Sequence, residues 1–130
     1  MKNQYKDILA TFSKGFPLLG KIYELYQKTP ELSPDENNTL RRSVEMTVLE
    51  ILELIVVASR QGKEAKENTL KQVVIKLGVI KVFIDLARQT GVVKEVVSKE
   101  TLGAVNYIEK MVEGWVKALK NINENHKRKV

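Results

Sequence analysis

The side chains of this chain that could do chemistry are mostly carboxylates and amines, since the sequence has no cysteine and one histidine, His126. Three glutamates, Glu45, Glu50 and Glu53, fall within one helical segment. Metal sites in helical bundles use inward-facing Glu-x-x-His pairs from several helices. Glu50 and Glu53 fall outside the expected core stripe of their helix. A solvated or ion-paired acidic face is the better interpretation, and no metal or cofactor is expected.

Catalytic constellations are missing from the sequence as well. His126 lies in a polar stretch near the C-terminus, which offers no basis for a Ser-His-Asp triad or a zinc site. The glycine patterns of phosphate loops and dinucleotide-binding folds do not occur. Trp115, Tyr23 and Tyr26 fall on expected core stripes, so packing explains them better than a ligand box does. We therefore expect no catalytic residues and no enzyme activity.

Lysines and arginines are abundant and regularly spaced. The chain has 22 of them against 16 acidic residues, a net charge of +6. Lys14, Lys21 and Lys28 recur every seven residues, which places them on one helical face. Such a balance favours a polyanionic partner such as RNA, DNA or an acidic protein, while a merely solubilising surface is the alternative. The candidate nucleic-acid-binding residues are Lys14, Lys21, Lys28, Arg41, Arg42, Lys63, Lys81, Arg88, Lys110, Lys117, Lys127, Arg128 and Lys129.

Aromatic residues do not interleave with these lysines along the chain. Proteins that read single strands by stacking combine a basic groove with aromatic platforms. Base stacking is therefore not expected, and recognition would depend on shape and charge.

Four helices must carry these faces, because apolar residues recur at helical spacing and no segment alternates over a strand's length. The expected helices cover residues 6–28, 33 or 39 to 61, 63–90 and 98–123. Ser33 is the expected N-cap of the second helix, and Gly62 and Gly91 are expected to cap the C-termini of the second and third. Short connections predict an all-α, antiparallel up-down four-helix bundle over residues 1–123, followed by a flexible basic tail at 124–130.

The core of this bundle follows from one apolar stripe on each helix. The expected stripe of the first helix is Ile8, Phe12, Phe16, Leu19, Ile22, Tyr23 and Tyr26, and that of the third is Leu70, Val73, Leu77, Ile80, Ile84 and Ala87.

The third helix carries a second apolar stripe, well separated from the first. A helix of a small bundle needs only one such face, so a second one predicts self-association. A weaker stripe on the second helix lies among charges of both signs. The alternative is a helix buried on both sides within one subunit. The candidate oligomer interface is Leu49, Leu52, Val56, Ile75, Val79, Val82 and Leu86.

The expected location is the cytoplasm. The absence of cysteine suits a reducing compartment. Lys2, Lys6 and Asp7 interrupt any apolar run at the start, so no signal peptide is expected. No stretch reaches the roughly 18 apolar residues that a membrane span needs.

Three segments together resemble a known family. They are Leu40-Arg41-Arg42 with Leu49–Ala58, then Leu77–Ala87, and finally Met111-Val112-Glu113-Gly114-Trp115. In order and spacing they resemble the accessory variability determinant (Avd) proteins of diversity-generating retroelements, over most of residues 40–119. A sister group with the same bundle, encoded in intervening sequences of ribosomal RNA genes, is the nearest competitor.

The resemblance implies a non-catalytic four-helix bundle that assembles into a homopentamer. It also implies binding to a reverse transcriptase and its template RNA in mutagenic retrohoming. Of the family's basic positions, Lys81, Arg41 and Arg42 carry over to this chain. Asp85 stands where the family often has a second basic residue, and Glu113 replaces a frequent glycine. The resemblance to the intervening-sequence group implies instead a structural or protein-interaction role.

Overall fold

The structure is a computed structural model that describes residues 16–129, with side chains described for residues 17–125. Four α-helices make up nearly all of this part of the chain. They are α2 (Phe16–Lys28), α3 (Thr39–Ser59), α4 (Lys63–Gln89) and α5 (Glu95–Lys129), and a short 3-10 helix, η1 (Thr29–Leu32), follows α2. No strand occurs among the described residues, which confirms the all-α class. The first ten residues of the predicted first helix lie outside the described part.

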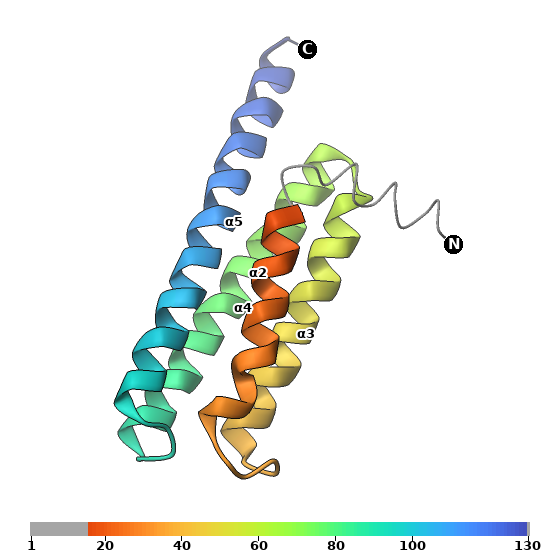
Figure 1. Cartoon of the computed structure of the whole chain (residues 1–130). Coiled ribbons are helices and arrows are strands. Elements are labelled where there is room, and N and C mark those ends of the chain that lie inside the picture. Colours follow the sequence, from red (N-terminus) through yellow and green to blue (C-terminus); the bar gives the residue numbers. More distant parts are fainter. Residues whose placement is uncertain (1–15, 130) are drawn as a thin grey trace, which may run out of the picture.

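The helices form a bundle in which α2 lies between α3 and α5, and α4 packs against α3 and α5 (Figure 1). Consecutive helices run in opposite directions in this view. The described part of α2 has 13 residues and α5 has 35, so at 1.5 Å per residue they span about 20 Å and about 50 Å. The C-terminal end of α5 therefore projects beyond the other helices. None of the helices within residues 16–129 is long and apolar enough to cross a membrane.

Two of the predicted helix caps are wrong. The N-cap of α3 is Asn38, whose side-chain oxygen accepts a hydrogen bond from the Arg41 backbone N–H at 3.0 Å. The Ser33 hydroxyl instead accepts from the Asp35 N–H at 3.2 Å, in the turn before the helix. Gly62 precedes α4 as its N-cap, whereas α3 ends on Arg60. Gly91 has a φ of +78°, the left-handed conformation that glycine tolerates best, and ends α4 as predicted.

The last helix is longer than its apolar pattern. It begins at Glu95, where the buried Ser98 hydroxyl donates to the Glu95 carbonyl at 2.8 Å within the first turn. It continues to Lys129, beyond the predicted end at Asn123. Residues 124–129 include Glu, Lys and Arg, which are good helix formers even where no neighbouring helix offers an apolar surface. The flexibility of this segment stays a prediction.

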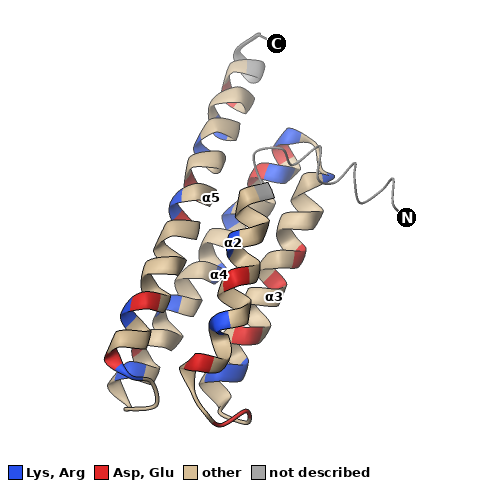
Figure 2. Cartoon of the chain, viewed as in Figure 1, with Lys and Arg blue, Asp and Glu red and all other residues tan. Residues whose placement is uncertain are grey.

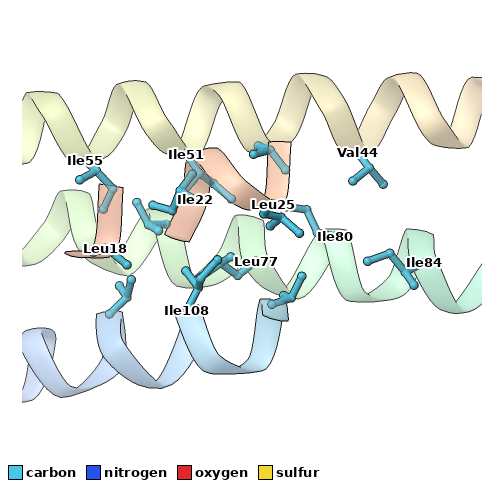
Figure 3. Packing of buried hydrophobic residues seen from close by; sticks show 14 of the residues in the cluster. Leu18, Ile22, Leu25, Val44, Ile51, Ile55, Leu77, Ile80, Ile84 and Ile108 are labelled. Carbon is cyan, nitrogen blue, oxygen red and sulfur yellow. The ribbon is translucent and has the colours of Figure 1, made fainter. Parts of the chain in front are cut away.

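Buried aliphatic side chains from all four helices meet along the axis of the bundle (Figure 3). All six predicted core residues of α4 are buried, at 0–4% exposure. The predicted stripe of α2 is partly wrong, because Leu18 and Leu25 are buried with Ile22 while Tyr23 is 51% exposed. The apolar residues of α2 cover about half of its circumference, so spacing alone does not fix which edge of this arc faces inward, and a tyrosine tolerates partial exposure.

Candidate functional site

The second apolar stripe of α4 faces away from the core. Its residues are Ile75, Val79, Val82 and Leu86, spaced four, three and four, and their exposure lies between 40% and 68%. We call these four residues the outer patch. The expected alternative, a helix buried on both sides within one subunit, is wrong. Four exposed aliphatic side chains on one helical face are a surface suited to contact with another protein surface.

The predicted interface residues of α3 are less exposed than those of α4. Leu49, Leu52 and Val56 are half-buried, and Leu52 packs against the core cluster. Two other apolar residues of α3, Met46 and Val57, are 59% and 48% exposed and were missed. They lie on the same helix as the predicted stripe but are displaced from it around the axis, and only the position of α4 decides which α3 residues stay uncovered.

Four of the predicted basic residues are already engaged by neighbouring oxygen atoms. The Arg41 guanidinium donates to Glu45 and to the Ser33 carbonyl, both at 2.9 Å, and its side chain is only 14% exposed. The shortest contacts of the other three are Lys81 with Glu109 at 2.8 Å, Arg88 with Asp85 at 2.7 Å and Lys21 with Glu24 at 3.4 Å.

The Asp85 hydrogen bonds raise the pKa of Arg88, as expected for a guanidinium that donates to a carboxylate. Asp85 is also the residue that stands where the family that this chain resembles often has a basic residue. These paired cations are less available to phosphates than free ones, because a phosphate must first displace the carboxylate.

Other predicted basic residues are exposed and have no ion-pair partner within the described part of the chain. They are Lys28, Arg42, Lys63, Lys110 and Lys117. Lys110 and Lys117 lie two helical turns apart on the outer face of α5, and Lys99 lies on the same face three turns earlier. Charges of both signs occur on every helix (Figure 2). Lys99, Lys110 and Lys117 therefore form a row of exposed lysines on one face of α5 that have no ion-pair partner in the described part of the chain.

The remaining predicted basic residues fall at the ends of the chain. Lys14 lies outside the described residues. Lys127, Arg128 and Lys129 belong to the last turn of α5, and their side chains lie outside the described part.

Polar contacts hold the C-terminal half of α5 beside the start of α4. The Asn123 amide donates to the Glu67 carboxylate at 3.0 Å and to the Lys63 carbonyl at 3.4 Å. Hydrogen bonds from Lys71 and Asn123 lower the pKa of Glu67. The Lys66 amine lies 5.9 Å from the centre of the Trp115 ring, a cation–π contact. These contacts orient the part of α5 that carries Lys117.

A groove between α2 and α5 brings an aromatic ring together with lysines that are distant in sequence. The Lys21 amine lies 5.8 Å from the centre of the Tyr107 ring, and this tyrosine is 55% exposed. The groove has a volume of about 210 Å³, and it is lined by Lys21, Glu24, Leu25, Lys28, Ala104, Tyr107 and Ile108. Aromatic residues and lysines thus interleave across helices although they do not along the chain, and sequence spacing could not reveal this.

The chain matches no family model, no curated protein and no solved structure. Among the described residues, no group of three or more histidine, cysteine or acidic side chains is placed to hold a metal ion. The fold therefore defines this molecule as an all-helical bundle, and its surfaces are the basis for inferring what it does.

Proposed function

We propose that this protein is a non-catalytic, self-associating helical bundle that binds nucleic acid. The observation that supports this proposal best is the row of Lys99, Lys110 and Lys117, exposed on α5 without ion-pair partners in the described part of the chain. Lysines that are free of carboxylates can neutralise phosphates and release the counterions bound to them. The net charge of +6 favours the same class of partner.

Self-association is supported by the outer patch on α4. Ile75 and Val82 are 68% and 64% exposed, although aliphatic residues of this size are commonly buried in folded proteins. Burying apolar area contributes roughly 25 cal/mol per Å², so covering four such side chains with another copy is favourable. The Lys99, Lys110 and Lys117 row lies on a different helix, so both surfaces can be occupied at once.

The resemblance to accessory variability determinant proteins makes this proposal more specific. On this basis the partners are a reverse transcriptase and its template RNA, and the oligomer is a homopentamer of antiparallel up-down bundles in the cytoplasm. The exposure of the outer patch supports an oligomer. The pairing of Lys81 with Glu109 argues against Lys81 as the RNA contact that the resemblance implies.

The alternative is a bundle with a structural or protein-interaction role, like those encoded in ribosomal RNA intervening sequences. It is favoured by the pairing of Lys21, Arg41, Lys81 and Arg88 with carboxylates. Such pairing reduces the net field that a phosphate backbone would meet.

Two measurements on the purified protein test the proposal. Fluorescence anisotropy with labelled RNA from 50 to about 300 mM salt should give an affinity that falls linearly on a log–log plot. An affinity that is absent, or flat with salt, would remove the nucleic-acid function and leave the structural alternative. Sedimentation velocity should show a species larger than one subunit, and a strict monomer at all concentrations would contradict self-association.

A further inference from the structure

The groove between α2 and α5 has features that the row of lysines on α5 lacks. Its lining includes three apolar residues, Leu25, Ala104 and Ile108, and the half-exposed Tyr107. Two lysines of α2, Lys21 and Lys28, line it as well. A surface of this composition offers an apolar stacking face beside positive charge.

Lys21 and Lys28 lie seven residues apart on one helix, about 10 Å along its axis. Lys28 has no ion-pair partner among the described residues. Lys21 contacts Glu24 through a single 3.4 Å pair in which both side chains are about half-exposed, at 47% and 60%. Exposed pairs of this kind contribute little free energy, so a phosphate can replace the Glu24 carboxylate.

The size of the groove limits the ligands that fit. Pockets for free small molecules enclose roughly 300–1,000 Å³, and this groove of about 210 Å³ is smaller. A segment of a polymer that places one planar ring against Tyr107 and leaves its backbone outside suits the space better. Aromatic side chains beside lysines hold single-stranded nucleic acid in this manner, since every base has a face that can stack.

We propose that the α2–α5 groove binds a single-stranded segment of nucleic acid, with one base stacked on Tyr107 and the adjacent phosphates on Lys21 and Lys28. This inference rests on the proposed nucleic-acid function and adds a class of ligand to it. Lys21 moves from the Tyr107 ring to a phosphate when the base arrives, which its long, half-exposed side chain permits. Duplexes bind through the lysine row of α5 alone, because their bases are already stacked.

The test compares four ligands: a 12-nucleotide poly-U RNA, the matching poly-dT, an abasic strand of the same length, and an RNA duplex. Tyr107→Leu should weaken binding of poly-U and poly-dT by roughly 5- to 150-fold, the range for losing one stacked base. Binding of the abasic strand and of the duplex should stay unchanged. The two base-containing strands distinguish RNA from DNA as the source of the base.

Two matched variants control for the loss of a ring. Tyr107→Phe keeps the stacking face and should bind like wild type. Tyr23→Leu removes another tyrosine of similar exposure, 51%, that does not line the groove, and it should also bind like wild type. Because Tyr107 and Tyr23 are exposed, circular dichroism should show unchanged helicity in all three variants.

The charged part of the proposal has its own readout. Lys21→Gln with Lys28→Gln should lower the slope of log affinity against log salt on poly-U by about 1.4, or about 0.7 for each phosphate contact. If Tyr107→Leu lowers the affinity for the abasic and the base-containing strands equally, or changes neither affinity, the groove proposal is wrong and the nucleic-acid function stands. If the wild-type protein binds none of the four ligands, both proposals fail.

Discussion

The two faces of α4 consist of similar aliphatic residues and differ in their surroundings. Toward the bundle axis, Leu77 and Ile80 are fully buried between helices. On the opposite side of the same helix, Ile75 and Val82 are more than 60% exposed. Both faces follow helical spacing, so neither local propensity nor composition distinguishes them. The difference arises only from which side the other three helices occupy.

The inner face of α4 is required for folding, whereas the outer face remains exposed after the subunit has folded. One apolar stripe per helix is enough to form the core. The outer patch is exposed on the isolated subunit, and this exposure to water is unfavourable unless another surface covers it. We therefore expect the outer patch to be covered by a second surface, as the proposed self-association requires.

The largest expected effect is on the inner face. Leu77→Ala should lower the free energy of unfolding by about 2–5 kcal/mol, because it leaves a cavity among buried side chains. Ile75→Ala on the outer face should change it by no more than about 0.5 kcal/mol. Urea denaturation of both variants gives these values, at protein concentrations low enough to keep the subunits apart. Equal losses in the two variants would mean that the outer patch is part of the subunit's own core.

Self-association should show the opposite ranking. Val82→Glu places a charge in the outer patch and should convert the oligomer to subunits in sedimentation velocity, because an unpaired charge in an apolar contact is costly. Helicity by circular dichroism should be retained, since this side chain is 64% exposed.

Asn106→Glu is the matched control for Val82→Glu, because it adds the same charge at an exposed position of α5. It should leave the mass of the oligomer in sedimentation velocity unchanged. If Val82→Glu lowers the helicity as well as the mass of the sedimenting species, the outer patch stabilises the subunit itself.

Periodicity separated the two faces of α4 correctly because α4 is an uninterrupted helix of 27 residues. It failed on α2, where Leu18, Leu25 and Tyr23 exchange places with respect to the predicted stripe. An apolar arc that covers about half of a helix does not fix which of its edges faces the core. The orientation of α2 is set by its packing on α3 and α5, and the spacing of residues within α2 carries no information about the positions of those helices.

The candidate site was predictable to a similar degree. The exposure of Lys110 and Lys117 follows from their spacing, which places them on the side of α5 opposite the buried Val105, Ile108 and Val112. The engagement of Lys81 by Glu109 does not, since it depends on how α4 and α5 are aligned. Tyr107 and Lys21 meet for the same kind of reason, through the packing of the first described helix on the last.

The contrast between free and paired cations predicts a smaller, graded effect. Lys110→Gln with Lys117→Gln should reduce the salt slope on single-stranded RNA by about 1.4. Lys81→Gln with Arg88→Gln removes the same charge from paired positions and should change the slope by much less. Anisotropy titrations at several salt concentrations measure both. Equal reductions would show that ion pairing does not protect these residues from phosphate.

The smallest effect concerns the polar contacts that accompany the packing of α5 on α4. The pKa of Glu67 is lowered by its hydrogen bonds to Lys71 and Asn123. A carboxyl whose folded pKa is depressed stabilises the fold above its unfolded pKa, here about 4.5, and that stabilisation is lost as pH falls through the folded value. Wild type should therefore have a higher Tm than Glu67→Gln at pH 7, and the difference should shrink below about pH 4.5. A difference that stays constant down to pH 3 would mean that the Glu67 charge does not stabilise this contact.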